Sequence, residues 1–370
     1  MKLAIAKEQL LLGLQAVQNI VGSRTTLPIL SNILLKCVSG RLHLTATDLD
    51  VTVSCNVPAN VHEEGSVTVP GRKFVGIVRE LVVAEVEIEA DDKAAVTIRS
   101  GGSYFKINGL SAAEYPPLPT FRQTKAVSVP QEKLKAMLRR TSFAVSSDET
   151  RYVLNGIFFS LKQDKLTLVA TDGRRLALTD EDAEIPAESE GDFIVPTKAI
   201  NELARLLAAG GAEIKYGENQ VSFALTPATE AGLAVEIISK LVDGTYPNYR
   251  QVIPQESLER VNVPREELLH SLRRAEIMTS EKSNSVKLAF SKNQLAITAN
   301  TPEIGESRET MALTYKGKDM AIAFNPAYLM DPLKALDTDE VTLELIDELS
   351  PGVVKSTEPF LYVIMPMRMG

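Results

Sequence analysis

The chain repeats itself three times, and this repeat constrains its fold more than any other feature. Three similar segments open the three thirds of the chain, and each reads as a strand, a short polar break and apolar residues at helical spacing: KLAIAKEQLLLGLQAV (2–17), VSVPQEKLKAMLRRTSF (127–143) and VNVPREELLHSLRRAEI (261–277). The corresponding leucines, Leu10, Leu134 and Leu268, lie 124 and 134 residues apart. A repeat of this period indicates three copies of one domain, of about 120 residues each.

The later elements of each third repeat in the same order. A hairpin comes next, followed by a second strand that leads into a helix: 33–48, 157–172 and 286–300 for the hairpins, and 67–81, 193–207 and 322–336 for the strand and helix. Alternating apolar residues, such as Leu42 with Leu44 and Leu166 with Leu168, are typical of strands with one buried face. Three elements in the same order three times favour duplication over three unrelated domains.

We therefore expect an α+β fold of three repeated domains, each with two helices packed on antiparallel sheets. The proline-rich segment EYPPLPTF precedes one boundary, and 254–257 holds the other. The expected domains are residues 1–122, 123–254 and 255–370. Six helices are expected, at 7–20, 71–81, 131–146, 197–209, 265–279 and 326–336. Pro70 and Pro196 stand where helices begin, a position at which a missing N–H is tolerated.

Two of these helices show clear apolar faces. In the first, Leu134, Met137, Leu138 and Thr141 share one side, and in the second Leu268, Leu269 and Leu272 do so. A helix with one such face packs against a core and turns its other side to solvent.

Positive charge is concentrated on these helices. The whole chain has a net charge of −8, which would argue against a nucleic acid partner. However, the six expected helices hold 14 Lys or Arg against 8 Asp or Glu, and the rest of the chain holds 26 against 40. A positive surface within a negative shell suits a polyanion that is held in one place and repelled elsewhere. A merely solvated helix face is the alternative explanation for any single helix.

No catalytic or metal-binding motif stands out. The sequence contains no P-loop, no G-x-S-x-G, no H-E-x-x-H and no paired-cysteine cluster, and its three histidines are widely spaced. Asp48 and Asp172 are equivalent residues of two repeats, so we expect them to cap turns in separate domains rather than to form a carboxylate pair. We expect no cofactor, no metal, no catalysis and no membrane span. Two cysteines and a polar N-terminal segment predict a protein of the cell interior.

Four segments carry a resemblance to a known family: TLPILSNILL (26–35), VATDGRRLAL (169–178), KLVDGTYPNYRQVIP (240–254) and YVIMPMR (362–368). In order and over essentially the whole chain, they resemble the β subunit of bacterial DNA polymerase III, the sliding clamp. The resemblance implies a half-ring of three clamp domains that dimerises head to tail into a closed ring around duplex DNA. It also implies a non-catalytic processivity factor that slides without sequence specificity.

Helix geometry agrees with a dimeric ring. Twelve helices spaced about 10 Å apart enclose a circle ~38 Å across their axes, which leaves ~28 Å after a radius of ~5 Å is taken from each side. Groove depths and phosphates make B-DNA a rod of roughly 20 Å. Six helices would leave only ~9 Å by the same reasoning. Dimerisation is therefore a requirement for the proposed function.

The resemblance implies three sets of site residues. DNA contact falls on Arg24, on Arg151 of the 147–151 loop together with Tyr152, and on Arg72, Lys73 and Lys198, to which we add Arg139 and Arg140 for their charge alone. Asp148 stands where the family often has a neutral polar residue. The subunit interface falls on Phe105 and Ile107 of an edge strand and on Ile277 and Met278, which could otherwise be core residues at a helix end.

The third set forms a hydrophobic pocket for short partner peptides: Leu154, Thr171, Gly173, Arg174, Arg175, Leu176, Pro247, Val252, Tyr328, Leu349, Val363, Met365, Pro366, Met367 and Arg368, with Pro351 at its edge. Flexible methionines accept varied apolar side chains, although without the family Met365 and Met367 would be read as core residues. Arg174 and Gln251 replace a frequent His and Arg of the family.

The partners implied by the resemblance are duplex DNA, a second copy of the chain and several proteins with short linear motifs. These proteins are the polymerase α subunit, within a complex that also holds a 3'–5' exonuclease, the clamp loader, translesion polymerases, mismatch-repair proteins and ligase. The expected location is cytoplasmic, at the nucleoid. A hydrolase with carboxylates in a cleft, and a repeat scaffold that binds no nucleic acid, are the alternatives.

Overall fold

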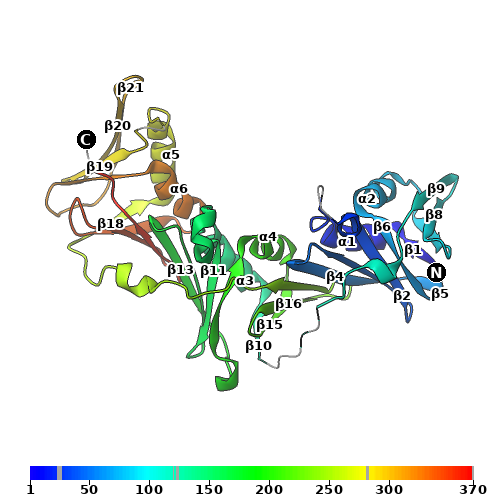
Figure 1. The fold of residues 1–370 in the computed structure, drawn as a ribbon. Coiled ribbons are helices and arrows are strands. Elements are labelled where there is room, and N and C mark those ends of the chain that lie inside the picture. The colour runs from blue at the N-terminus through cyan, green and yellow to red at the C-terminus, as the bar shows by residue number, and fades with distance from the viewer. Residues whose placement is uncertain (23–26, 120, 122–124, 281–282, 369–370) are drawn as a thin grey trace. The chain divides into compact units, whose positions relative to one another are not determined.

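The computed structural model describes residues 1–22, 27–119, 121, 125–280 and 283–368 (Figure 1). Its helices are α1 Lys7–Val17, α2 Gly71–Glu80, α3 Gln131–Thr141, α4 Thr197–Leu206, α5 Arg265–Glu276 and α6 Pro326–Ala335. All six helices predicted from the sequence are confirmed, and each begins at the predicted residue. Every helix ends earlier than predicted, by up to five residues in α3, where a 3-10 turn (Ser142–Ala144) follows. There Thr141 has a φ of −122°, outside the α-helical range, and its hydroxyl donates to the Met137 carbonyl 2.9 Å away.

The strands form four antiparallel sheets, which confirms the predicted α+β class. A five-stranded sheet runs in the order β5 Asn60–Glu63, β1 Lys2–Ala6, β7 Glu85–Ala90, β8 Ala95–Ser100 and β9 Ser103–Asn108. A four-stranded sheet runs β21 Gly305–Ala312, β20 Gln294–Thr301, β19 Val286–Ser291 and β22 Met320–Phe324.

The other two sheets have eight strands each. The first runs β10 Ala126–Pro130, β15 Gly210–Tyr216, β16 Gln220–Pro227, β17 Val235–Lys240, β4 Val51–Pro58, β3 Arg41–Thr47, β2 Asn32–Val38 and β6 Gly65–Pro70. The second runs β14 Gly191–Pro196, β11 Gly156–Lys162, β12 Lys165–Thr171, β13 Arg175–Asp182, β25 Leu361–Ile364, β24 Gly352–Lys355, β23 Glu340–Leu345 and β18 Glu259–Pro264. Each sheet contains strands from two consecutive repeats.

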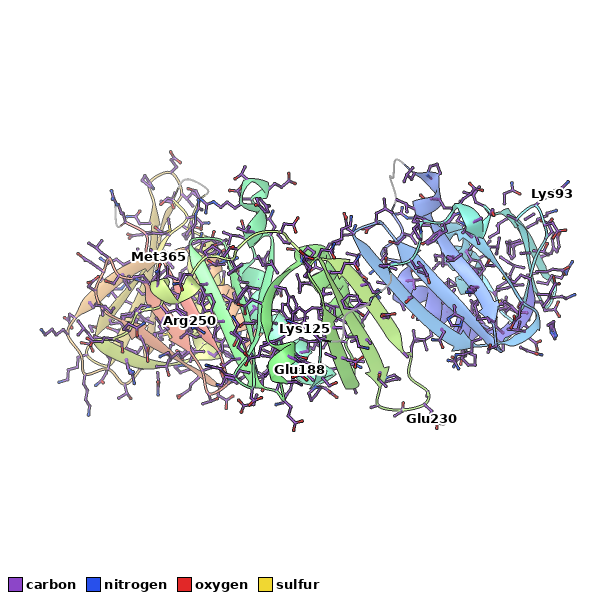
Figure 2. The ribbon with its side chains drawn as sticks, turned by 60° about the horizontal axis from the view of Figure 1, so that its bottom comes forward. Lys93, Lys125, Glu188, Glu230, Arg250 and Met365 are labelled. Atoms are coloured by element: carbon purple, nitrogen blue, oxygen red, sulfur yellow. The ribbon has the colours of Figure 1, made fainter. Side chains whose placement is uncertain are left out.

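The chain consequently divides into two compact units that do not follow the three repeats. Unit 1 comprises 1–135, 183–190 and 198–241, and unit 2 comprises 136–182, 191–197 and 242–370. The middle repeat supplies strands to both units. Its β17 pairs with β4 of the first repeat, and its β13 pairs with β25 of the third. In unit 1, Figure 2 shows Glu230 in the loop that joins β16 to β17.

The cores follow the predicted apolar pattern. Leu42 and Leu44 are fully buried in β3, and so are Leu166 and Leu168 in β12. The predicted helix faces are also buried: Leu134, Met137, Leu138 and Thr141 on α3, and Leu268, Leu269 and Leu272 on α5. Burial of each large apolar side chain is worth about 1.5–3 kcal/mol, so these faces fix the helices on their sheets. The exposed side of each helix then carries most of its charged residues, with Arg140 of α3 as a buried exception.

Candidate functional site

The predicted DNA-contact residues on the helices differ in their surroundings. On α2, Arg72 and Lys73 are exposed, and no ion pair within the described part of the chain engages either side chain. Lys198 of α4 is exposed and forms an ion pair with Asp48. Arg139 of α3 is half-exposed and donates from Nη1 to Asp337 Oδ1 at 3.2 Å. These four cations remain accessible to a ligand.

Two further predicted residues lie in the 3-10 segment Glu149–Leu154. Arg151 and Tyr152 both expose more than half of their side chains. Asp148 caps the segment by accepting hydrogen bonds from the Thr150 amide (3.0 Å) and hydroxyl (2.6 Å). The Thr150 hydroxyl bond is the main cause that lowers the pKa of Asp148, so this carboxylate stays ionised near Arg151, 3.7 Å away. The predicted residue Arg24 lies outside the described residues.

The predicted DNA contact of Arg140 is wrong. It was expected to contact DNA, but it is buried, and its Nη2 lies 2.9 Å from Glu358 Oε2. Its Nη1 lies 3.8 Å from Glu181 Oε1. Two carboxylates thus compensate a guanidinium that a phosphate cannot reach, because burying an unpaired charge is very costly. The helical position of Arg140, one turn from Met137 on the apolar side of α3, was the signal that charge alone concealed.

The predicted turn-capping role of the two equivalent aspartates is confirmed. Asp172 Oδ1 accepts hydrogen bonds from the amides of Arg174 (2.9 Å) and Arg175 (3.1 Å). Asp48 Oδ1 accepts from the amides of Asp50 (3.0 Å) and Val51 (2.7 Å). Between Asp172 and Arg174, Gly173 has a φ of +85°, a conformation that glycine adopts without strain. The resulting tight turn presents Arg174 to solvent.

Arg175 connects this turn to α6. Its Nε lies 3.1 Å from Asp172 Oδ2, its Nη1 lies 2.6 Å from Asp331 Oδ2, and its Nη2 donates to the Phe143 carbonyl at 2.6 Å. Its guanidinium carbon also lies 4.2 Å from the ring centre of Tyr328. A planar donor fork with this many partners is a rigid brace. Arg175 therefore positions Tyr328, and little of its own side chain is left for a ligand.

The C-terminal segment runs alongside the turn. In β25, Val363 pairs with Leu176 of β13, and past the strand the Met365 amide donates to the Arg174 carbonyl at 2.9 Å. The Met367 amide then donates to the Ala323 carbonyl at 2.7 Å. These two backbone bonds hold Met365 and Met367 in place while their side chains stay about 40% exposed. Figure 2 labels Met365 and, in the same unit, Arg250.

A buried apolar cluster supports this region: Leu154, Val169, Leu176, Ile194, Tyr246, Val353 and Val363. Phe158, Tyr249 and Ile253 pack against it, and the rings of Phe158 and Tyr246 stack 4.9 Å apart. Three residues predicted for the peptide pocket, Leu154, Leu176 and Val363, are thus its buried support rather than its exposed wall. The tyrosines of the cluster were missed as site residues, although both stand in the motif 240–254.

Large apolar side chains are exposed on segments that adjoin members of this cluster in the chain. They are Val252, Leu349, Met365 and Met367, with Tyr152 in the preceding segment. The other predicted members, Gly173, Arg174, Pro247 and Arg368, are exposed, whereas Thr171, Tyr328 and Pro366 are half-buried. We call this whole set in unit 2 the C-terminal surface. Exposed apolar groups over a packed floor, surrounded by arginines, are typical of protein-binding surfaces.

Two sheet edges, one in each unit, are two further candidate surfaces. Among the described residues β9 pairs only with β8, and it exposes Phe105 while Ile107 is half-buried. In unit 2, β21 is likewise an edge strand, and the nearby residue Ile277 is 73% exposed after the end of α5. Met278 is half-buried, with its carbonyl accepting from the Thr301 hydroxyl at 2.7 Å. Such edges require a partner or a cover.

The described residues include no group of three or more His, Cys, Asp or Glu side chains placed to hold a metal ion. In the same part of the chain, no helix has the length and apolar character to cross a membrane.

Comparison with known proteins adds three family matches. The three domains of the DNA polymerase III beta subunit match in order: the N-terminal domain at residues 1–119, the central domain at 128–248 and the C-terminal domain at 250–368. The beta sliding clamp of Chlamydia muridarum is 37% identical over 369 residues, which is 100% of this chain and 99% of that protein. The beta sliding clamp of Escherichia coli K12 is 36% identical over 377 residues, with full coverage of both chains.

Solved structures show the same similarity. The DNA polymerase sliding clamp of Bacillus subtilis superimposes with a TM-score of 0.94 at 32% identity, and both chains are fully covered. The DnaN sliding clamp of Pseudomonas aeruginosa bound to griselimycin has a TM-score of 0.94 at 35% identity, also with full coverage.

Proposed function

The chain belongs to the DNA polymerase III beta subunit family, the bacterial sliding clamps, and we propose that two copies close head to tail around duplex DNA. Three family matches and relatives above 30% identity over the whole chain establish this membership. The family is non-catalytic and confers processivity on the replicative polymerase. The resemblance seen in the sequence is therefore confirmed, together with the α+β clamp fold and the absence of an enzymatic role.

The charge of the helices carries the proposed DNA contact. Within their observed bounds the six helices still hold 14 Lys or Arg against 8 Asp or Glu, in a chain whose net charge is −8. Their apolar faces are buried on the sheets, and most of the cations, though not Arg140, are on the sides that face away from the cores. A ring lined with such helices attracts DNA inside and repels it outside.

The DNA-contact set that we retain is Arg24, Arg72, Lys73, Arg139, Arg151, Tyr152 and Lys198. Arg140 is removed because it is buried against Glu358 and Glu181. Contacts of these types go to phosphates and carry no sequence information. Since a closed ring cannot leave without opening, each contact can be weak, and weak contacts permit sliding.

We assign the subunit interface to β9 and the end of α5. Phe105 and Ile107 of one copy would meet Ile277 and Met278 of the next. This assignment rests on two edge strands, β9 and β21, and on the exposed apolar side chains of Phe105 in β9 and Ile277 after α5. A head-to-tail contact of this kind forms a closed ring when its rotation closes, and two copies of three domains supply the twelve helices needed for a duplex.

We assign peptide binding to the C-terminal surface. Met365, Met367, Val252 and Leu349 would contact the apolar side chains of a partner's linear motif, and Arg174 and Arg368 its polar groups. The polymerase α subunit, clamp loader, translesion polymerases, mismatch-repair proteins and ligase are the proposed partners. Exposed methionines that can repack suit one surface with many partners. The proposed location is the nucleoid, and the proposed domain boundaries are those given by the sequence, 1–122, 123–254 and 255–370.

One experiment tests the central proposal. The purified protein is loaded onto nicked circular DNA by an ATP-driven clamp loader, and the bound fraction is followed by gel filtration before and after the circle is cut once. We expect retention on the circle and rapid loss after cutting, because the linkage is topological. Equal retention on both forms would indicate direct binding, and no retention on either would favour a scaffold that does not bind nucleic acid.

A further inference from the structure

A hollow of about 460 Å³ in unit 1 is lined by α1, by the end of α4 and by the β16–β17 loop, which Glu230 marks in Figure 2. Most of its lining side chains are apolar, and the largest of these are Leu12, Leu206, Leu225, Pro227, Leu233 and Val235. We call this cavity the α1–α4 hollow. None of the described residues assigned above to DNA, to peptides or to the subunit interface lines it.

The side-chain amide of Gln131, in the wall of the hollow, is already bonded within the protein. Its Nε2 donates to the Gly211 carbonyl at 3.0 Å and to the Thr226 carbonyl at 2.9 Å. Its Oε1 accepts from the Ala208 amide at 2.9 Å. An amide nitrogen has two N–H donors, and both are used here. A polar ligand therefore finds no free donor on Gln131.

Arg205 is the one charged side chain among the described residues that line the hollow. Its Nη1 donates to the Gln15 carbonyl at 3.0 Å, and its Nη2 donates to the Ala16 carbonyl at 2.7 Å. Its Nε lies 3.0 Å from Glu202 Oε2, which compensates the charge. These contacts attach the end of α4 to α1. The guanidinium is thus engaged by the protein itself.

Backbone hydrogen bonds hold the loop that forms one wall of the hollow. The Ala228 amide donates to the Ala209 carbonyl at 3.0 Å, and the Gly232 amide donates to the Thr229 carbonyl at 3.0 Å. A Cβ at Gly232 would lie 2.3 Å from Pro227 Cβ, so the loop packs closely on its own start. The hollow is therefore part of the fold before a ligand arrives, which lowers the cost of binding.

The duplicated sequence shows what fills the equivalent place between the middle and third repeats. Leu10 of α1 and Leu134 of α3 are equivalent, and Ala16 and Arg140 each stand six residues further along the chain. Arg140 is the buried arginine that two carboxylates compensate. At Ala16 the side chain is a single methyl group, so the space of a guanidinium side chain is left open.

The strand register supplies a second correspondence. Strand β17 pairs with β4 as β25 pairs with β13, and two positions of β4 and β13 that are 124 residues apart are equivalent in the same way as the leucines. The pairs at these positions are Ser54 with Glu236 and Leu178 with Leu361. Three residues before the second members stand Leu233 and Glu358. Leu233 therefore takes the place of the carboxylate that compensates Arg140.

Apolar residues thus stand in the first place where charged residues stand in the second. The corresponding pairs are Ala16 with Arg140, Leu233 with Glu358, and the buried Val57 with Glu181. A charge that leaves water requires a compensating partner, and these three residues of unit 1 offer none. The hollow is therefore suited to an uncharged group. It adjoins the start of β17, whereas the ion pair of Lys240 with Asp50 lies at the end of that strand.

We propose that the α1–α4 hollow binds a small uncharged apolar molecule of about the size of a bicyclic ring. Its volume falls within the range of about 300–1,000 Å³ that is typical of ligand pockets. An apolar molecule gains free energy when it leaves water for such walls, whereas a charged one loses its hydration without finding a partner. The hollow lies in unit 1 and the C-terminal surface in unit 2, so this site is independent of the proposed function.

The test titrates indole, an uncharged bicyclic compound, into the full-length protein with isotope-labelled leucine methyl groups, followed by NMR. Leu12→Met and Leu233→Met each remove the signals of one residue and so assign them. We expect the signals of both leucines to shift with one common Kd. Indole-3-carboxylate, which carries a negative charge on the same ring, should bind at least about 10-fold more weakly. Shifts confined to leucines outside the hollow, or equal affinity for the two compounds, would overturn the proposal.

A double variant copies the filled place of unit 2 into unit 1. Ala16→Arg with Leu233→Glu should occupy the hollow with an ion pair and raise the Kd of indole at least about 10-fold. Circular dichroism checks that the variant folds. Wild-type affinity in the folded double variant would show that indole binds elsewhere and would overturn the proposal.

Leu233→Asp decides the question if the double variant does not fold. Leu233 is half-buried in a loop, so the fold tolerates an aspartate there, but the unpaired carboxylate should weaken indole binding at least about 10-fold. Leu118→Asp, which places the same charge on an exposed segment of unit 1 outside the hollow, is the matched control and should keep the wild-type Kd. An unchanged Kd for Leu233→Asp, or equal loss in the two variants, would contradict the assignment.

Discussion

Mutation of two adjacent arginines of α3 should affect different properties of the protein: Arg140→Ala its stability, and Arg139→Ala its retention on DNA. Arg140 exposes 8% of its side chain and is paired with Glu358 and Glu181, each of which exposes 20%. Removing one partner of a buried ion pair costs about 3–5 kcal/mol, since the other charge is left unpaired. Because both carboxylates keep some contact with water, we expect the stability loss caused by Arg140→Ala to lie near the lower end of this range, at about 3 kcal/mol.

The control stands one residue earlier. Arg139 exposes 44% of its side chain and its partner Asp337 exposes 69%, so Arg139→Ala should cost less than about 1 kcal/mol. Urea denaturation followed by circular dichroism measures both variants. In a thermal scan, a unit of about 150–250 residues loses roughly 2–4 °C per kcal/mol, which gives about 6–12 °C for Arg140→Ala.

The two variants should also separate in DNA retention. Arg139→Ala should weaken retention at moderate salt because an accessible cation is lost, whereas folded Arg140→Ala should be retained normally. A cost for Arg140→Ala no larger than that for Arg139→Ala would refute the buried ion pair. If the Arg140→Ala variant is retained less on DNA at a temperature where it is fully folded, Arg140 would belong to the DNA-contact set after all.

Two other substitutions test the interface and the turn. The double substitution Ile277→Ala with Met278→Ala should weaken the dimer. If the isoleucine alone loses about 1.5–3 kcal/mol of burial energy, the dimer Kd should rise roughly 10- to 150-fold. An unchanged dimer in sedimentation would contradict the interface assignment. Gly173→Ala should destabilise unit 2 by about 1 kcal/mol and weaken peptide binding. The φ of +85° at residue 173 suits glycine, and the added Cβ would lie 2.7 Å from Arg151 Nη1. Gly211→Ala, where a Cβ would meet no atom within 4 Å, is its control, and equal effects of the two in urea denaturation would contradict the strain argument.

The sequence predicted the helices and the core well because both follow from local periodicity. Leu134 and Leu268 stand at equivalent points of repeated amphipathic segments, and their burial needs no long-range information. The helix ends were less predictable, since α3 ends where Thr141 takes a φ of −122°, outside the α-helical range, and a 3-10 turn follows. The two turns were also predictable from the sequence, because Asp48 and Asp172 accept hydrogen bonds from amides only two and three residues away.

Strand pairings and side-chain contacts between residues far apart in the chain could not be predicted from the sequence. Nothing in the spacing of residues showed that β17 would pair with β4 and β13 with β25, so that each large sheet joins two repeats. Nor did charge alone show that Arg140 would meet Glu358, 218 residues away along the chain. Arg175 was placed at the peptide site by resemblance, but its bonds to Asp331 and to the Phe143 carbonyl make it a brace of that site.

Duplication explains why the chain has two similar joints between repeats, and side chains explain why they differ. At the first joint, the turn after β3 carries Asp48 and Asp50, which form ion pairs with Lys198 and Lys240 of the middle repeat. At the second joint, the equivalent turn carries Gly173 and Arg174, and the chain that follows β25 lies against it through the Met365 amide. Exposed ion pairs contribute little binding energy and offer no apolar contact. Exposed methionine, valine and leucine side chains over a packed floor do offer it. The equivalent positions therefore carry charged side chains at one joint and exposed apolar side chains at the other. This difference supports the proposal that each chain binds peptides at the C-terminal surface alone, although its fold is built from three copies of one domain.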